Sequence, residues 1–140
     1  GRGPLNRSST WWGYGDIKAS NLRSYFSGDS GYGKHFKKIG EDHGPFDISL
    51  IDCGQYNKAW KYAHMFPHEA VKAARDLKTE FFIPIHWGGF TLAMHSWDEP
   101  VVESIRWSDE AGLKCLTPEI GDEISKAGLN EQFIKWWEKY

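Results

Sequence analysis

Cysteine, long hydrophobic runs and blocks of a single charge are all scarce in this sequence. The two cysteines, Cys53 and Cys115, lie far apart in a chain with 40% hydrophobic residues. This is typical of free, buried thiols and not of a disulfide framework. The pattern favours a reducing compartment such as the cytoplasm. No run of about 18 apolar residues is present, so the sequence offers no candidate for a transmembrane helix.

Charge is distributed evenly along the chain. The formal net charge is −2, with acidic and basic residues interspersed. The sequence therefore has neither a basic stripe nor an acidic tail, and electrostatics indicate neither a nucleic acid nor an anionic membrane as a partner.

The first residues, Gly1-Arg2-Gly3-Pro4, lack an initiator methionine and have neither the charged nor the apolar segment of a signal peptide. We therefore expect the chain to be part of a longer protein, with any export signal upstream of Gly1. A chain of 140 residues is long enough for one structural unit with its own core. Its eight tryptophans are many for this length, and we expect some of them to face a cavity or a partner.

Strand-like and helix-like segments alternate along the chain, which predicts an α/β fold. Two β-prone runs around a polar turn predict an antiparallel hairpin at residues 9–17 and 22–27. Apolar runs predict further strands at residues 46–51, 81–85 and 113–116. Apolar positions three and four apart predict helices at residues 35–40, 67–77, 99–112 and 129–137. Residues 52–66 show no clear period and predict a long loop, a kind of segment that is usually functional.

Two polar side chains follow predicted strands directly. His86 comes after the apolar run Phe81–Ile85 and before two glycines, and Asp29 follows Ser24–Ser27 inside a glycine-rich loop. The carboxyl ends of strands in α/β proteins are where binding groups collect. An imidazole and a carboxylate presented in this way form a candidate pair of metal ligands.

Each candidate also has an ordinary structural explanation. Asp29 in Gly-Asp-Ser-Gly suits an Asx-turn, His86 suits a hydrogen-bonded strand end, and His64 suits an exposed loop. Ser30 lacks the strand-to-helix elbow of a serine hydrolase. We expect the remaining histidines to be solvated: His35, His43, His68 and His95. Considered singly, these residues leave both interpretations open.

Four segments together resemble, in order and spacing, the C-terminal half of the metallo-β-lactamase fold. They are residues 25–32 (YFSGDSGY), 44–47 (GPFD), 63–71 (AHMFPHEAV) and 84–88 (PIHWG). The branch that they resemble contains the phospholipase D that hydrolyses N-acyl-phosphatidylethanolamine and its bacterial RomA-like relatives. The resemblance covers about residues 1–118 and leaves residues 119–140 as a C-terminal extension with a closing helix. It implies half of an αββα sandwich, a mixed sheet with helices on one face.

The resemblance also implies a metal-dependent hydrolase. In that family the aspartate matching Asp29 bridges two metal ions, the histidine matching His86 binds one, and the histidine matching His64 lies on the substrate side. We therefore predict Asp29 and His64 as catalytic residues, and Tyr56 and Trp87 as further substrate-side candidates. Zinc is the expected metal, with iron and manganese open. A small-molecule or lipid phosphodiester is the expected substrate, and a lactone or other ester is the alternative.

Several family features are absent. The motif His-x-His-x-Asp-His does not occur in these 140 residues, Phe66 stands where relatives carry a capping Asn or Asp, and Asp52-Cys53 replaces an apolar pair. A non-catalytic association module, with Asp29 and His86 as relics, is therefore a competing interpretation. Because each half of the sandwich contributes a sheet, we expect this half to pair through its sheet face, with the missing N-terminal half or with a second copy as a homodimer. Alone, it should bind zinc weakly and be inactive.

Overall fold

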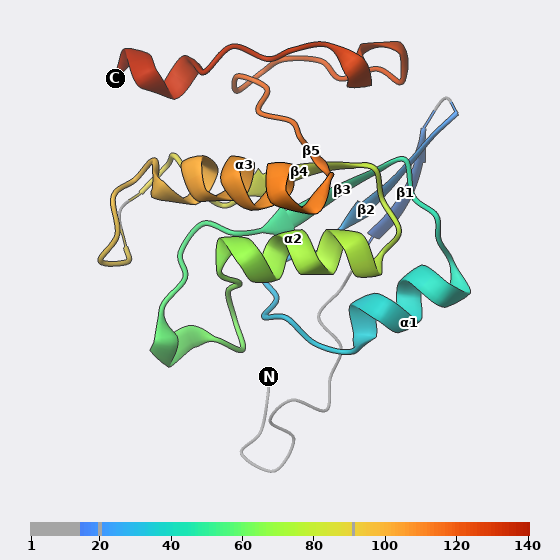
Figure 1. The fold of residues 1–140 in the computed structure, drawn as a ribbon, viewed down its shortest axis with the longest axis horizontal. Coiled ribbons are helices and arrows are strands. Elements are labelled where there is room, and N and C mark those ends of the chain that lie inside the picture. Colours follow the sequence, from blue (N-terminus) through green and yellow to red (C-terminus); the bar gives the residue numbers. More distant parts are fainter. Residues whose placement is uncertain (1–14, 20, 91) are drawn as a thin grey trace.

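The computed structural model describes residues 15–19, 21–90 and 92–140. The described residues form one five-stranded sheet in the sequential order β1-β2-β3-β4-β5 (Figure 1). The strands are β1 (Gly15–Ala19), β2 (Leu22–Phe26), β3 (Ile48–Asp52), β4 (Phe81–Ile85) and β5 (Lys114–Cys115). The first pair is antiparallel and the other pairs are parallel, so the predicted mixed sheet is confirmed. Most of the predicted first strand, residues 9–14, lies outside the described residues.

Three α-helices are present in the described part of the chain: α1 (His35–Asp42), α2 (Pro67–Asp76) and α3 (Glu99–Ala111). They follow β2, β3 and β4 in turn, and sequential parallel strands joined by right-handed crossovers place their helices on the same face of a sheet. Figure 1 shows α1 and α2 on one side of the strands and the C-terminal segment on the other. The helices predicted in these three places are confirmed.

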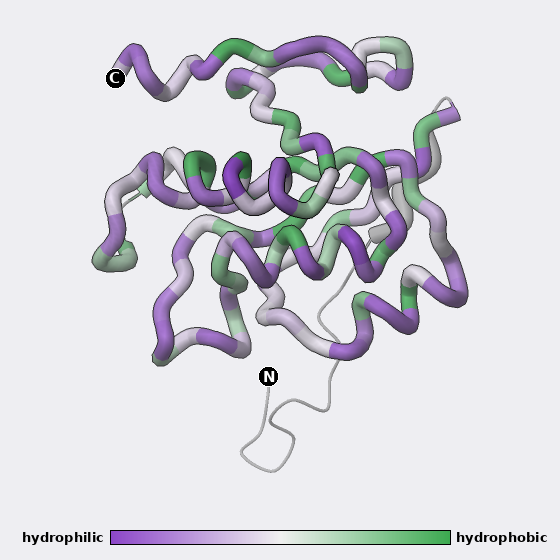
Figure 2. Tube along the Cα trace, viewed as in Figure 1, coloured by the Kyte–Doolittle hydropathy of each residue, from purple (hydrophilic) through white to green (hydrophobic). Residues whose placement is uncertain are grey.

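The sequence explains where these helices begin and end. Pro67 occupies the first turn of α2, and the Glu69 carboxylate accepts a hydrogen bond from the backbone nitrogen of Phe66 at 3.0 Å. This contact satisfies the backbone donor of Phe66, the residue that precedes the helix. Gly112 ends α3 in the left-handed conformation, with φ of 70°. Each helix alternates hydrophilic and hydrophobic residues along its length, as an amphipathic layer requires (Figure 2).

The two faces of the sheet carry separate apolar clusters, because successive strand residues point in opposite directions. Phe82 points toward the helices and packs in the main core with residues of β2, β3, α1 and α2. Its neighbours Phe81 and Ile83 belong to a second cluster on the other face, together with Leu22, Ile48, Leu116, Ile124, Leu129 and Phe133. The last three of these residues come from the C-terminal segment.

The predicted closing α-helix is wrong. Residues 127–130 and 136–139 form two short 3-10 helices, η2 (Ala127–Asn130) and η3 (Trp136–Lys139). The spacing of Leu129 and Trp137 suggested one helical face, but Leu129 packs on the sheet and Trp137 packs beside Val101 of α3. Leu129 and Trp137 pack in different clusters, so the chain between them does not form one continuous helix.

The expectation of a bare second sheet face is corrected in part. The C-terminal segment covers the end of this face where the strands begin. Toward the ends of the strands the face carries Phe26, Leu50 and Ile85, which are only half-buried. Alternation along β3 places Asp52 on this same face.

Both cysteines are free thiols, as predicted, with Cys53 buried and Cys115 half-buried. Burial raises the pKa of the Cys53 thiol to about 12. No helix among the described residues has the length and apolar character needed to span a membrane.

Candidate metal centre

Three polar side chains meet at the edge of the sheet where the parallel strands end. Asp29 follows β2, Asp52 is the last residue of β3, and His86 follows β4. One ligand atom from each lies within 4.8 Å of the others. The convergence follows from the register of the sheet, in which Asp52 pairs with Ile85. The structure thus brings together the predicted pair and a third residue, Asp52, which was not predicted as a ligand.

His86 contacts both carboxylates through one nitrogen. Its Nδ1 lies 3.2 Å from Oδ1 of Asp29 and 3.2 Å from Oδ1 of Asp52. The pKa of His86 is raised, mainly because Asp52 accepts a hydrogen bond from the imidazole, and partial burial opposes this shift. The charges of Asp52 and Asp29 raise it further. The site therefore favours a positive charge at the position of the imidazole.

Asp52 is the buried member of the group, with a side chain that is 0% exposed. Its Oδ2 lies 2.8 Å from Nδ1 of His64 and accepts a hydrogen bond from the backbone nitrogen of Ser30 at 3.3 Å. An ionised carboxylate can only accept, so a hydrogen bond between these two atoms requires the His64 tautomer with its proton on Nδ1. Within the described residues, the ion pairs of Asp52 are with imidazoles alone. A buried carboxylate with no fixed cation is costly, and a bound metal ion would offset that cost.

Backbone contacts fix the loops that carry these side chains. A Cβ on Gly54 would lie 1.5 Å from the carbonyl oxygen of His86, so only glycine lets these two chain segments approach so closely. The backbone nitrogen of Gly31 donates to the carbonyl oxygen of Tyr62 at 3.2 Å, which ties the Asp29 loop to the loop that follows β3. The centre is therefore held by packed main chain and not by side chains alone.

His64 comes from that long loop and reaches the centre through Asp52. Its imidazole is 24% exposed and lies edge-on to Trp60 at 6.5 Å. The predicted proximity of His64 to Asp29 and His86 is thus explained by a shared buried carboxylate.

Tyr56 and Trp87, the other predicted substrate-side residues, each pack against other aromatic side chains. The Tyr56 hydroxyl donates to Oε1 of Glu99 at 2.5 Å, and burial raises the pKa of that hydroxyl well above its usual value. The Tyr56 ring stacks on His95 at 4.2 Å, which shows that His95 is not the solvated residue we expected. Trp87 packs among other tryptophans, and its indole nitrogen donates to the carbonyl oxygen of Pro84.

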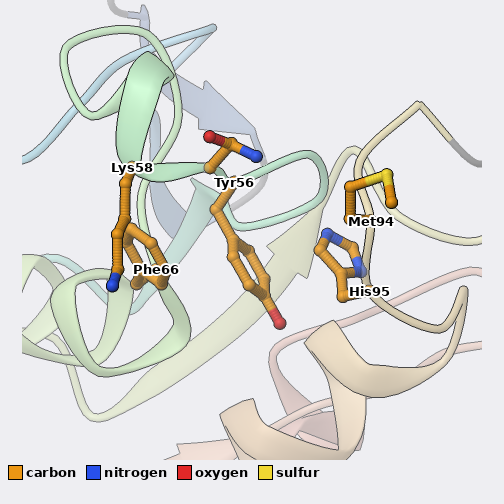
Figure 3. Close-up of a pocket in the computed structure, with 6 residues that line it drawn as sticks. Tyr56, Lys58, Phe66, Met94 and His95 are labelled. Atoms are coloured by element: carbon orange, nitrogen blue, oxygen red, sulfur yellow. The ribbon is translucent and has the colours of Figure 1, made fainter.

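Tyr56 and His95 also line a shallow cavity of about 280 Å³ (Figure 3). Its other lining residues are Asn57, Lys58, Phe66 and Met94. The cavity has aromatic walls and an exposed lysine at its rim, and Figure 3 shows the Tyr56 ring lying between Phe66 and His95.

Comparison with known proteins identifies the family. A sequence profile of the β-lactamase superfamily domain matches residues 2–87. The chain belongs to this superfamily.

Superfamily relatives include proteins of several kinds. The chain is 39% identical over 136 residues to an uncharacterised protein of Mycobacterium tuberculosis, a match that covers 95% of this chain and 36% of that protein. It is 46% identical over 88 residues to the outer membrane protein RomA of Klebsiella pneumoniae, covering 63% of this chain and 66% of RomA. It is 37% identical over 94 residues to the N-acyl-phosphatidylethanolamine-hydrolysing phospholipase D 1 of Caenorhabditis elegans, covering 65% of this chain and 26% of the enzyme.

Among solved structures, a metallo hydrolase of the archaeon Ignicoccus hospitalis, Igni18, matches with a TM-score of 0.56 at 21% identity, covering 73% of this chain and 40% of that one. This likeness confirms the fold. The resemblance predicted from the sequence is confirmed as well, and the chain spans about a third of the length of its mycobacterial relatives.

Superfamily membership implies a metal cofactor, and the donor set fits one. Zinc bonds of about 2.0–2.1 Å in a tetrahedral site place neighbouring ligand atoms roughly 3.3 Å apart. The separations of 3.2 Å between Nδ1 of His86 and the two carboxylate oxygens match that spacing. Two carboxylates and one imidazole also suit zinc, iron and manganese by ligand type.

Proposed function

We propose that this chain is the C-terminal, metal-binding part of a binuclear metal-dependent hydrolase that cleaves a phosphodiester. The observation that carries the proposal is the convergence of Asp29, Asp52 and His86 at one edge of the sheet, with ligand atoms within 4.8 Å. Similarity to a phospholipase D supports a phosphodiester as the substrate class.

The chain's own residues have distinct roles in this proposal. Two divalent cations, when bound, supply a nucleophile at neutral pH and stabilise charge that builds on a phosphoryl oxygen. Asp29, whose side chain is 58% exposed, and His86 would be the residues that hold the cations. Asp52 orients His64 by accepting a hydrogen bond from its Nδ1–H, which leaves Nε2 of His64 free to hold or release a proton on the substrate side. Zinc is the metal that we propose.

The proposed whole protein also needs a second sheet. The half-buried apolar residues Phe26, Leu50 and Ile85 lie on the face that carries the metal centre. We propose that an N-terminal half covers this surface in the complete protein, and that a second copy of the chain covers it when that half is absent.

A substrate panel tests the proposed activity. The complete, zinc-loaded protein is assayed with bis(p-nitrophenyl) phosphate, an N-acyl-phosphatidylethanolamine and a simple lactone. We expect turnover of the phosphodiesters, and Asp29→Ala should lower it by orders of magnitude. The matched control is Asp42→Ala, which removes an exposed carboxylate that pairs with Lys38 on α1.

Two outcomes contradict the proposal. Turnover of the lactone alone would replace the phosphodiesterase by an ester hydrolase on the same centre. Turnover that Asp29→Ala leaves unchanged would favour the non-catalytic module.

A further inference from the structure

The turn that carries His86 has an unfavourable backbone conformation. The φ angle is 68° at His86 and 79° at Gly88. Glycine adopts this left-handed region freely, but a residue with a Cβ does so rarely. Such a conformation persists where the surrounding structure holds it, and here it is the conformation that presents His86 to both carboxylates.

One side of the turn is held by Gly54, as described above. The other side is held by Trp87, whose indole packs in a cluster of tryptophans. Its ring stacks on Trp136 with centroids 5.2 Å apart and an interplanar angle of 23°, and it meets Trp137 edge-on at 5.8 Å. Trp97 completes the stack at 6.5 Å.

Trp136 and Trp137 belong to η3, so the contacts come from the end of the chain. Both side chains are buried, at 7% and 3% exposure. The Trp136 indole nitrogen donates to the carbonyl oxygen of Pro118 at 3.2 Å. A Cβ placed on Gly88 would meet the Trp136 ring at an ordinary 3.7 Å, so this ring lies beside the turn with room for one side-chain carbon between them.

The segment that carries η3 depends on such contacts for its position. It consists of short 3-10 helices and irregular chain, and Figure 1 shows it running apart from the three helices of the main layer. Its buried anchors fall into two groups, Leu129 on the sheet and the tryptophans at the His86 turn. The tryptophans do not pack on the sheet, so covering the sheet does not explain their burial.

We propose that η3 is a positioning element that locks the His86 turn through Trp87, with Trp136 as the principal positioning residue. In this account the C-terminal segment holds a metal ligand in place without touching the metal or the substrate. The inference rests on the proposed function, because that function supplies the metal that His86 binds. It gives the C-terminal segment, residues 119–140, a part in holding the His86 turn.

Two readouts in the complete protein test this inference. The first is amide hydrogen exchange across residues 84–90 without metal, and the second is the affinity and visible absorption spectrum of bound cobalt(II), used as a probe in place of zinc. For Trp136→Ala we expect about tenfold faster exchange in the turn and about tenfold weaker cobalt binding with an altered spectrum. Trp136→Phe keeps a stacked ring and should restore most of both properties.

Leu129→Ala is the matched control, because it removes a similarly buried anchor of the same segment that does not contact Trp87. We expect it to lower thermal stability while leaving exchange in the turn and cobalt affinity within about twofold of the parent.

The inference is overturned if Trp136→Ala leaves exchange and cobalt affinity unchanged, or if Leu129→Ala reproduces both losses. If Trp136→Ala does not fold, Trp136→Leu against Trp136→Phe makes the same comparison between an aliphatic and an aromatic side chain. If the parent protein binds no metal, the proposed function fails while hydrogen exchange still decides whether η3 holds the turn.

Discussion

Asp52 connects the residues of the candidate centre. It is completely buried, contacts the imidazoles of His64 and His86, and accepts a hydrogen bond from the backbone of Ser30 in the Asp29 loop. Each loop of the centre thus reaches the same carboxylate. The chemical behaviour of the site should therefore depend on the charge of this side chain as much as on the two predicted ligands.

Removing that charge while keeping the shape tests this dependence. Asp52→Asn should weaken zinc binding by roughly 10- to 100-fold, because the neutral amide neither ligates zinc well nor holds the imidazoles in the same way. The measurement is calorimetric titration with zinc at fixed pH. Asp42→Asn should leave the affinity unchanged, and an equal loss in both variants would contradict the role given to Asp52.

The raised pKa of His86 predicts a pH dependence of stability in the metal-free protein. A group whose pKa is higher in the folded state contributes stability below its unfolded pKa of about 6.5, and that contribution is lost as the pH rises through the folded value. The free energy of unfolding of the parent should therefore exceed that of His86→Asn by more at pH 5.5 than at pH 8.5. Urea denaturation at the two pH values measures this difference, and a difference of opposite sign would contradict the assignment.

Asp29 and His86 could be predicted from the sequence, but Asp52 was not. The first two stand between an apolar run and glycines, which marks the end of a strand. Asp52 stands at the end of an apolar run too, but it opens residues 52–66, whose lack of a clear period predicts a loop. Only the register of β3 with β4 shows that it lies beside His86.

At the scale of elements, the close approach of the loops after β3 and β4 builds the centre. The backbone nitrogen of Cys53 donates to the carbonyl oxygen of Ile85 at 3.1 Å, which continues the sheet ladder to the edge of the site. Gly54 then lies directly against the backbone of His86. The geometry of the site therefore depends on one small residue that is not itself a ligand.

Gly54→Ala should disrupt this contact, because the new Cβ would lie 1.5 Å from a backbone oxygen that cannot rotate away. We expect the free energy of unfolding to fall by about 2 kcal/mol and zinc affinity to fall with it. Gly89→Ala is the matched control, since a Cβ there meets nothing within 4 Å. Urea denaturation and zinc titration of both variants check the prediction, which fails if the two variants behave alike.

The helices of the main layer could be predicted because each has a regular apolar face and clear boundary residues, such as Pro67 and Gly112. The C-terminal segment could not. Leu129, Phe133 and Trp137 have helical spacing, but their partners lie on two different parts of the molecule. Periodicity along a sequence does not show which cluster an apolar residue joins.

At the scale of the whole molecule, the sheet has one face covered by helices and one covered in part by the C-terminal segment. The uncovered part carries Phe26, Leu50 and Ile85 beside the metal centre. An apolar surface of this kind favours association with a partner sheet.

The isolated 140-residue chain should therefore self-associate. Light scattering after size-exclusion chromatography should show a dimer, and Leu50→Lys should shift it toward monomer by placing a charge on the uncovered face. Val102→Lys changes an exposed residue of α3 and should leave the dimer intact. A monomeric parent chain, or equal dissociation of both variants, would contradict the proposed use of this face.

Asp29, Asp52 and His86 together hold a metal ion in the proposed centre. The most direct measurement is anomalous diffraction at the zinc absorption edge from crystals of the zinc-loaded protein. We expect an anomalous peak at the end of the parallel strands, with Asp29 and His86 at bonding distances of about 2.0–2.2 Å and Asp52 either bound to the ion or hydrogen-bonded to the imidazole ligand. The absence of a peak at this edge, or a zinc ion held without Asp29 and His86, would contradict it.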